Sequence, residues 1–424
     1  MKKTPLYKWH RSNGANMASF GEYSMPLWYE AGAKKEHLAV ISTAGLFDTS
    51  HMSGITVKGA GARSLIQRCF SKDLERCIGI NKKPLAAGRS NYGIFATESG
   101  HVLDDGLVSQ VTEDLYFIVV NSGMGSPVCK VLSDNRGDRT VTIKDHTDAL
   151  GKIDIQGPLS GKILAGLLAD AETVLETFPY FSFKGWFDSS VDGVSPVRLK
   201  DGTEILLSRT GYTGEFGFEI FVHAEKTEIL WKTLLAAGAE KGLLPCGLAA
   251  RDSLRAGAVL PLSHQDIGDW PFAANPWPFA LAEKDESGTF TADFIGAKAL
   301  ANHQPTEFTY PFAGFDLRKI ATDEGHVVDE KGETLGIILT CATDMAIGRI
   351  DKTGPIVSIA TPKEKGRPED FKAKGLCCGF IKVDKKLSFG DIVYLTDGKR
   401  KLKVEIREDI RPDRTARKAI KKML

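Results

Sequence analysis

The segment SRTGYTGEFGFEIFV, Ser208–Val222, is where the interpretation of this sequence begins. Its second half, 216–222, follows a glycine-rich turn and is apolar almost throughout, which predicts a strand buried on both faces. Glu219 interrupts that strand. Because an unpaired carboxylate is costly to bury, we expect its side chain to meet either a bound ligand or a cation of the protein, such as Arg251 or Arg209.

The composition is that of an ordinary globular protein. The 424 residues are 42% hydrophobic and 26% charged, and this length suggests roughly three domains. With 55 basic and 54 acidic residues the formal charge is +1, which leaves no electrostatic footprint for nucleic acid. We also expect no membrane-spanning helix and no secretory signal, because no long apolar run occurs and none follows the first lysines.

The cysteines and histidines argue against a metal centre. Seven cysteines occur without a CxxC pair, and the nine histidines show neither HxH nor HExxH spacing. We therefore expect no metal site, and the scattered thiols favour a reducing cytoplasm. The turn before Glu219 also lacks the spacing of a phosphate-binding loop.

The pattern of elements changes along the chain. In the first three hundred residues, helical segments such as 31–45 and 225–242 alternate with extended ones. After about Pro311, short strands with glycine turns predict a small all-β domain. Within it we interpret 353–375 as a charged, flexible excursion, and the tail RKAIKKML as a solvated basic end.

A series of motifs resembles one known family, the T-proteins of the glycine cleavage system, which are tetrahydrofolate-dependent aminomethyltransferases. The resemblance runs nearly end to end, and the order and spacing of the motifs together make it specific. The motifs are TPLY from Thr4, GLFDTSHM from Gly45, LDDGLV from Leu103, VVNS from Val119, IQGP from Ile155, SRTGYTGE from Ser208 and GLAARDSLR from Gly247.

The resemblance implies an α+β fold of three domains around a central channel, in which folate lies with its pterin ring deepest. Two of the domains are discontinuous α+β units, and the third is a C-terminal β-barrel. The expected ranges are 1–55 with 150–255 for the first domain, 56–149 with 256–305 for the second, and 306–424 for the barrel with its charged insertion at 353–375.

Two residues of the opening segment match folate-binding positions of the family. Glu219 matches the pterin-binding glutamate, since a carboxylate can accept two N–H donors of the pterin edge at once. The resemblance implies that this ligand supplies the donors that Glu219 needs. Tyr212 is placed against the folate, where glycines at 211, 214 and 217 would let the backbone approach a flat ring; the alternative is a tyrosine packed on the surface of a turn.

Asp104, in HVLDDGLV, matches the family's catalytic aspartate. A carboxylate there could orient the folate, take up a proton during transfer and stabilise developing positive charge. Asp105 points to the opposite side of an extended chain, so we expect it to be structural. Without the family context, the pair would be interpreted as turn-forming residues.

Four further positions match residues near the folate. Asn121 ends an apolar strand, where its amide could bind the remaining pterin donor and acceptor or could cap local backbone. Arg251 matches an arginine near the folate, and its alternative is an ion pair with Asp252. Met52 and Tyr92 match positions that line the channel, and ordinary core packing is the alternative for both.

The sequence departs from the family pattern on the side of the one-carbon donor. The family segment SPLEAGLGW is NPWPFALAE here, with Pro278 at the glutamate position and Glu283 at the tryptophan position. The barrel turn TSGTxSP is TCATDMAIG, and Gly21-Glu22-Tyr23 replaces a GW dipeptide. These changes concern the donor more than the cofactor.

We therefore expect a cytoplasmic, tetrahydrofolate-dependent one-carbon transferase of the aminomethyltransferase type, which moves an aminomethyl-derived methylene to N5 of tetrahydrofolate. Its partner would be a lipoylated carrier protein, with no role for nucleic acid or membrane. Two alternatives stay open. One is a tetrahydrofolate-dependent demethylase of a small N-, O- or S-methylated substrate, which gives 5-methyltetrahydrofolate; the other is a non-catalytic folate-binding accessory protein, against which the intact Asp104 counts.

Overall fold

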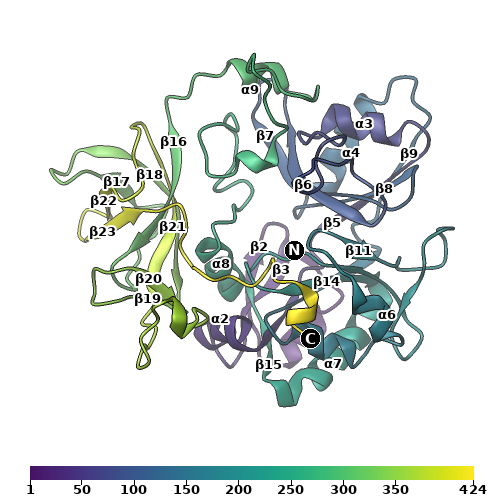
Figure 1. Ribbon diagram of the computed structural model, residues 1–424, viewed down its shortest axis with the longest axis horizontal. Coiled ribbons are helices and arrows are strands. Elements are labelled where there is room, and N and C mark those ends of the chain that lie inside the picture. The colour runs from purple at the N-terminus through teal and green to yellow at the C-terminus, as the bar shows by residue number, and fades with distance from the viewer.

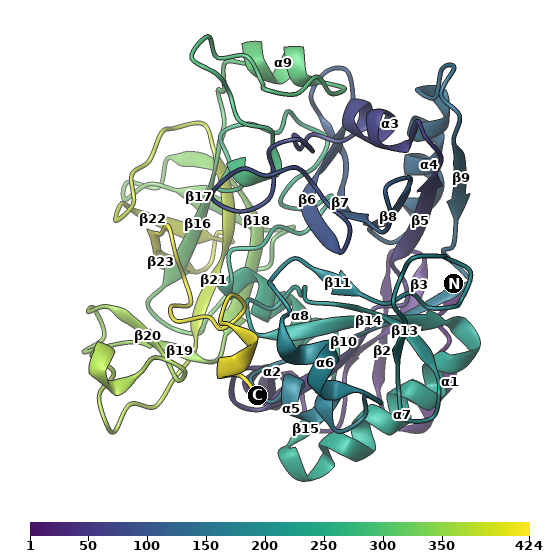
Figure 2. The same ribbon diagram turned by 45° about the vertical axis from the view of Figure 1, so that its right-hand side comes forward.

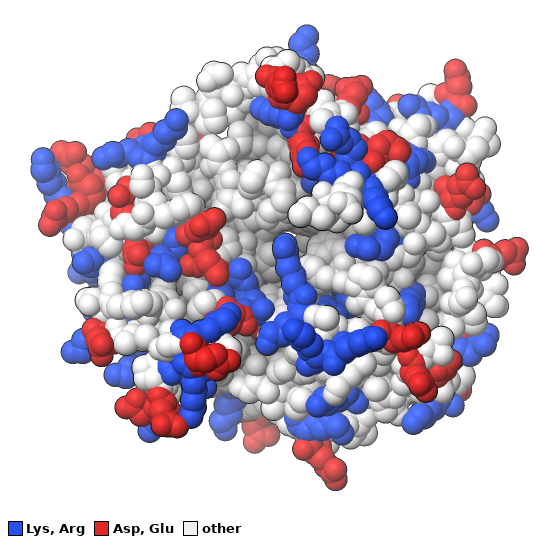
Figure 3. Space-filling view, in the orientation of Figure 1, with Lys and Arg blue, Asp and Glu red and all other residues white.

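Three β-structures divide the computed structural model, which describes residues 1–424, into parts that surround a central hollow (Figures 1 and 3). The first part lies at the bottom of Figure 1, the second at the upper right and a closed barrel at the left. Helices cover the sheets of the first two parts (Figure 2). The expected α+β class with a C-terminal barrel is confirmed.

The first part is built on a mixed sheet, with β4 and β15 parallel and the other pairs antiparallel. Its strands run in the order β11 (Phe183–Lys184), β13 (Glu204–Ser208), β14 (Gly217–His223), β10 (Leu150–Gln156), β4 (Ala44–Asp48) and β15 (Leu243–Cys246), with β12 (Val197–Arg198) paired to β13. A smaller sheet holds β1 (Lys2–Lys3), β3 (Tyr23–Trp28) and β2 (Asn16–Phe20). The helices are α1 (Tyr7–Ser12), α2 (Ala33–Ser42), α5 (Ser160–Ala165), α6 (Ala171–Glu176), α7 (Thr227–Gly238) and α8 (Leu248–Gly257), with 3-10 turns η1 (Ala224–Lys226) and η2 (Ala239–Lys241).

The second part is an antiparallel sheet inserted between β4 and β10 of the first. Its order is β6 (Arg89–Ala96), β7 (Val102–Gln110), β8 (Leu115–Val120), β5 (Ser53–Lys58) and β9 (Thr142–Asp145), with helices α3 (Ala62–Cys69) and α4 (Gly125–Asp134). Because β5 begins at Ser53, the expected domain boundary after residue 55 falls inside a strand.

The barrel closes through β16 (Phe308–Gly314), β21 (Leu376–Val383), β18 (Thr334–Asp344), β17 (His326–Val328), β22 (Ile392–Thr396) and β23 (Lys401–Ile406). The segment between α8 and β16, which contains η3 (Pro278–Ala280) and α9 (Ala297–Asn302), packs the second part against the barrel. For example, the Trp277 ring lies edge-on to Phe380, with 5.0 Å between the ring centroids. No helix of the chain has both the length and the apolar character needed to span a membrane.

Strand β14, expected from the opening segment, is buried on both faces, one by the core of the first part and the other by the second part. Alternate residues point into a core cluster with the helices of the first part, and these are Phe218, Ile220 and Val222. Glu219 and Phe221 point the other way, and the Phe221 ring lies edge-on to Phe117 of β8, with 5.3 Å between the ring centroids. Glu219 therefore lies where the first and second parts meet.

The insertion at 353–375 is more ordered than the sequence suggested. It contains η4 (Lys363–Lys365) and β20 (Ile356–Ser358), which is buried and forms a hairpin with β19 (Ile347–Arg349). The interpretation as a wholly flexible excursion is wrong, because its apolar start pairs with a strand and packs into a core cluster.

The C-terminal tail runs back from the barrel across the first part (Figure 1). Ile420 and Met423, in and beside the turn η5 (Ile420–Lys422), are buried in the core cluster of the first part. The predicted solvated basic end is therefore wrong. The lysines and the buried apolar residues lie on different sides of this short turn, and the sequence alone does not show what the apolar side covers.

A buried group of charges fastens this tail to the other parts. Arg411 pairs with Asp344 of β18 and, at 3.3 Å, with Glu215 of the first part. Asp344 Oδ1 also lies 2.9 Å from Nε2 of His37 on α2. Burial alone would raise the pKa of the Asp344 carboxyl, but Arg411 and His37 hold it well below its usual range.

Replacing Arg411 tests this fastening. Arg411→Met leaves Asp344 with His37 and the backbone N–H of Ala346, and Glu215 without its cation, so we expect the free energy of unfolding to fall by about 3–5 kcal/mol. Urea unfolding at pH 7.5 measures the change. Arg417→Met, on the exposed side of the same tail, is the control and should change little. Equal unfolding midpoints for Arg411→Met and wild type would contradict the assignment.

Candidate functional site

A cavity of about 410 Å³, here called the inner cavity, lies between the first and second parts. Its walls come from both parts and from residues 260–265, which follow α8. All the predicted site residues except Asp104 line it, namely Met52, Tyr92, Asn121, Tyr212, Glu219 and Arg251. The fold thus brings together side chains from distant segments of the sequence.

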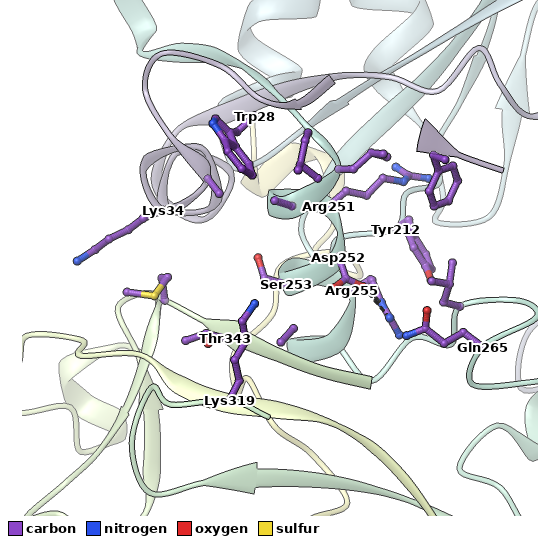
Figure 4. Close-up of a pocket in the computed structure, with 18 of the residues that line it drawn as sticks. Trp28, Lys34, Tyr212, Arg251, Asp252, Ser253, Arg255, Gln265, Lys319 and Thr343 are labelled. Carbon is purple, nitrogen blue, oxygen red and sulfur yellow. Dashed lines mark hydrogen bonds and ion pairs between the residues drawn. The ribbon is translucent and has the colours of Figure 1, made fainter. Parts of the chain in front are cut away.

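A second space of about 600 Å³, the outer chamber, adjoins the inner cavity between the first part and the barrel. Figure 4 shows Trp28 on one wall and Lys319 reaching toward Ser253 from the other. The residues that line both spaces are Phe20, Tyr212, Arg251, Leu262 and Gln265. The two spaces therefore form successive sections of one channel.

Both carboxylate oxygens of Glu219 have donors within the protein. Lys152 Nζ lies 2.9 Å from Oε1, and the Thr210 hydroxyl donates to Oε2 at 2.6 Å. The expectation that a ligand alone supplies the donors is wrong, and so is the alternative of an ion pair with Arg209 or Arg251, because the cation is Lys152. Each oxygen has two lone pairs, so Glu219 retains acceptor capacity toward the cavity.

Glu219 ends a row of alternating charges, here called the charge chain. Arg251 donates from Nη1 to Asp154 at 2.9 Å, Asp154 lies 2.5 Å from Lys152 Nζ, and Lys152 contacts Glu219. Lys152 gives its third hydrogen bond to Thr49 at 3.1 Å. Burial alone would raise the pKa of Asp154, but Lys152 and Arg251 lower it. Alternation of sign allows four charges to be buried together.

Tyr212 stands at the junction of the inner cavity and the outer chamber. Its hydroxyl donates to the backbone carbonyl of Pro261, and the Arg251 guanidinium lies 4.9 Å from the centre of its ring. Burial raises the pKa of the phenol. Tyr212 is therefore a channel residue and not a tyrosine packed on the surface of a turn.

The glycines around Tyr212 serve a different purpose from the one expected. A Cβ atom at Gly211 or Gly217 would lie 2.1 or 2.5 Å from Oε1 of Gln156. Gln156 occupies this space and donates from its amide to the carbonyls of Thr210 and Phe218. These two glycines thus admit a side chain of β10, which fixes the turn to the sheet.

The two aspartates of β7 both accept a hydrogen bond from the side-chain amide of Asn121, and Asp105 is the one that lines the inner cavity. Asp104 is fully buried behind it and accepts hydrogen bonds at 2.9 Å from the backbone and side chain of Asn121 and from the Ser263 hydroxyl. Asp105 thus lies on the cavity wall, and its expected structural role stays a prediction. The catalytic role of Asp104 stays a prediction.

Asp105 has the chemistry of a group that exchanges protons. Tyr92 donates to its Oδ2 and Asn121 to its Oδ1, each at 2.8 Å. Burial and the neighbouring charge of Asp104 raise the pKa of Asp105 to about 6, so it titrates near neutrality. The amide nitrogen of Asn121 serves the aspartates and not a ligand, which leaves its oxygen for the cavity.

Sequence reasoning missed Lys152, although a signal was present. In the strand LGKIDIQ, Lys152 and Asp154 lie two residues apart, which places both side chains on one face. Phe279 was also missed; it lines the inner cavity with its ring 5.9 Å from Tyr92, and no motif marks it.

Two histidines of the inner cavity were given no role, although one of them, His51, lies in the motif GLFDTSHM. His264 Nε2 lies 3.6 Å from Asp104, which raises the pKa of His264, and His51 lines the cavity beside Met52. No group of three or more His, Cys, Asp or Glu side chains is placed to hold a metal ion.

The segments that depart from the family pattern reach both spaces, and from them Gly21 and Phe279 line the inner cavity. Glu283 forms a half-exposed ion pair with Lys82 at 2.5 Å, and Pro278 opens η3. From the altered barrel turn, the residues Ala342, Thr343 and Met345 line the outer chamber.

Comparisons with known proteins agree with this arrangement. A family model described as the GCVT N-terminal domain matches residues 6–272, more than half of the chain. An aminomethyltransferase of Symbiobacterium thermophilum is 37% identical over 346 residues, which cover 80% of this chain and 85% of that protein. An aminomethyltransferase of Geobacillus thermodenitrificans is 38% identical over 343 residues, covering 80% and 86%. The chain belongs to the GCVT family.

This GCVT-family chain is an enzyme of the aminomethyltransferase type, a transferase of one-carbon groups. The crystal structure of glycine cleavage system aminomethyltransferase T from Bartonella henselae matches it with a TM-score of 0.72, over 96% of each chain and at 24% identity. That likeness establishes the three-part fold.

The raised pKa of Asp105 predicts how stability depends on pH. The folded state keeps a proton on Asp105 up to about pH 6, whereas the unfolded chain loses it near pH 4, so ionisation opposes folding as pH rises between these values. Asp105→Asn removes this effect and should raise the free energy of unfolding at pH 7.5 by up to about 3 kcal/mol, with no gain at pH 4.

Urea unfolding at the two pH values measures the difference. Asp138→Asn, at an exposed aspartate, should show no such dependence. An Asp105→Asn gain that is equal at both pH values would show that the pKa is not raised.

Removing Lys152 tests the charge chain. Lys152→Met leaves Glu219 with Thr210 as its protein donor and Asp154 with Arg251 and Thr49, so we expect a loss of about 3–5 kcal/mol in the free energy of unfolding. The control is Lys130→Met, whose ammonium is exposed and pairs with Asp134, and it should cost under about 0.5 kcal/mol. If both variants unfold at the wild-type midpoint, the charge chain does not stabilise the sheet.

Proposed function

We propose that this enzyme transfers an aminomethyl-derived one-carbon unit from a lipoylated carrier protein to N5 of tetrahydrofolate, in the cytoplasm. The observation that carries the proposal is the placement of Glu219: a carboxylate backed by Lys152 lines an otherwise largely apolar cavity at the junction of two parts. All seven cysteines are free thiols, which suits a reducing compartment.

The residues of the inner cavity fit tetrahydrofolate. Its volume of about 410 Å³ lies within the range of small-molecule sites. Glu219 has lone pairs left for the two N–H donors along the edge of a pteridine, a charge-assisted and bidentate contact. Met52, Tyr92 and Phe279 supply apolar surface for the ring, and Asn121 has an unused amide oxygen. These residues would hold the heterocycle.

Tetrahydrofolate, when bound, supplies the ring amine that accepts the one-carbon unit. Asp105 is the aspartate on the cavity wall, and with a pKa of about 6 it is largely ionised at neutral pH, ready to take up a proton from the attacking amine. Asp104 stands behind it, contributes to its raised pKa, and holds Asn121 and Ser263 in place. We propose that the catalytic role predicted for Asp104 belongs to the pair, with Asp105 facing the reacting groups.

The outer chamber is the proposed route for the donor. Its wall includes Leu27, Trp28 and Met345, whose apolar surface suits an extended thioether arm, and it reaches the inner cavity at Tyr212 and Arg251. The barrel turn that differs from the family pattern lines this chamber, so the donor's outer contacts are where we expect this chain to differ from other members.

The test combines folate binding with turnover. We expect tetrahydrofolate to raise the melting temperature of wild type, and Glu219→Gln to lose most of that shift, because an amide puts an N–H group against the ligand's N–H donors. Asp104→Asn and Asp105→Asn should keep most of the shift and lose turnover. Glu228→Gln, at an exposed glutamate of α7, should match wild type.

Turnover is measured with an aminomethylated lipoyl carrier, by the release of ammonia and the formation of methylenetetrahydrofolate. Formation of 5-methyltetrahydrofolate from a small methylated substrate, without ammonia, would establish the demethylase alternative. Folate binding without either reaction would favour the accessory protein. Equal folate shifts in wild type and Glu219→Gln would contradict the pteridine assignment.

A further inference from the structure

His51 is a polar residue of the inner cavity that the proposed chemistry leaves unexplained. It lines the cavity with only 4% of its surface exposed, and its Nδ1 is buried without a hydrogen-bond partner. Five buried side-chain polar atoms in the chain lack a partner, and a second, Oγ of Ser122, also belongs to a residue lining this cavity. Nε2 is not among these enclosed atoms, so it is the ring nitrogen that is open to the cavity.

The imidazole of His51 is held in its position by packing. Phe20 lies edge-on to it with 5.3 Å between the ring centroids, and the Tyr23 ring is 6.4 Å away. The turn that carries it is closed by a hydrogen bond from the backbone N–H of Met52 to the carbonyl of Thr49. The ring of His51 therefore packs against the small N-terminal sheet, which contributes Phe20 and Tyr23.

The surroundings of His51 keep it neutral. Burial and the positive charges of Arg251 and Lys152 lower its pKa to about 4. A neutral imidazole has one N–H donor and one acceptor. An unpaired acceptor is tolerated in a protein interior better than an unpaired N–H, so the enclosed Nδ1 is the acceptor and the proton is on Nε2, toward the opposite ring edge.

Two other donor groups of this wall, those of Lys152 and Asn121, are already engaged. The three N–H groups of Lys152 go to Thr49, Asp154 and Glu219, and the amide of Asn121 goes to the two aspartates. A pteridine presents a carbonyl oxygen directly beside the two N–H donors that Glu219 would accept. A ligand bound in this way needs a hydrogen-bond donor next to Glu219.

We propose that His51 is a specificity-determining binding residue, whose Nε2–H donates to the 4-oxo group of the pteridine while Glu219 accepts from the adjacent N–H groups. This inference rests on the proposed function. Together the two side chains select a heterocycle that presents donor, donor and acceptor in sequence. A 4-amino analogue, which places a donor against the His51 donor, is disfavoured.

Calorimetric titration with tetrahydrofolate and with its 4-amino analogue tests this selection. Wild type should prefer the 4-oxo compound by about tenfold or more, and His51→Phe should bind it about tenfold more weakly and lose the preference. His51→Gln keeps an N–H donor and should retain most of the affinity. His326→Phe, at an exposed histidine of β17, is the control and should behave as wild type.

The ligand-free melting temperature separates a binding role from a structural one. His51→Phe removes a buried atom without a partner, so the variant should melt at or above the wild-type temperature. A histidine that supported the fold would lower it, and that result would overturn the proposal. The imidazole nitrogen spectrum of wild type gives an independent measure that needs no variant, because tetrahydrofolate should shift the Nε2 signal of His51.

Different results would overturn the role of His51 and the proposed tetrahydrofolate-dependent function. If wild type binds tetrahydrofolate but His51→Phe has the same affinity and the same preference, or the His51 signal does not move, the role of His51 is overturned and the proposed function stands. If wild type does not bind tetrahydrofolate, both are overturned.

Discussion

Lys152 places its ammonium between the carboxylates of Asp154 and Glu219, at 2.5 and 2.9 Å, on the face of the sheet opposite the apolar core cluster. Without this cation two carboxylates would lie opposite each other on neighbouring strands, out of reach of water. Arg251 continues the alternation and carries it to the mouth of the inner cavity. The three other charges offset the cost of burying the Glu219 carboxylate, so the sheet can present it to a ligand.

The channel exists because three parts are held at fixed positions around it. Arg411 and His37 converge on Asp344 of the barrel, so the tail, helix α2 and strand β18 meet at one buried carboxylate. The outer chamber is walled by residues from these same neighbourhoods. A change in that contact would alter the width of the channel, although none of these three side chains lines it.

Polar groups of the inner cavity fall into two kinds. The aspartates of β7 are supplied with donors by Asn121, Tyr92 and Ser263, and their mutual proximity leaves one of them titratable near neutrality. His51, in contrast, encloses its Nδ1 without a partner and leaves only its Nε2 open to the cavity. In a selective binding site, polar groups that are paired within the protein fix the wall of the cavity. Polar groups without a protein partner form hydrogen bonds only with a ligand that has matching donors and acceptors.

The local chemistry of the chain was determined by the sequence: the strand around Glu219, the C-terminal barrel, and the set of side chains from Met52 to Arg251 that line one cavity. Tertiary structure decided the rest. Alternation along β7 does not show which aspartate lines the cavity, and only packing shows that it is Asp105, with Asp104 buried behind it. Likewise Lys152 lies 67 residues before Glu219, and the buried tail meets a core made of distant segments. Such pairings depend on which surfaces face each other after folding. A local sequence pattern shows which face of a strand a side chain is on, but not which residue packs against it.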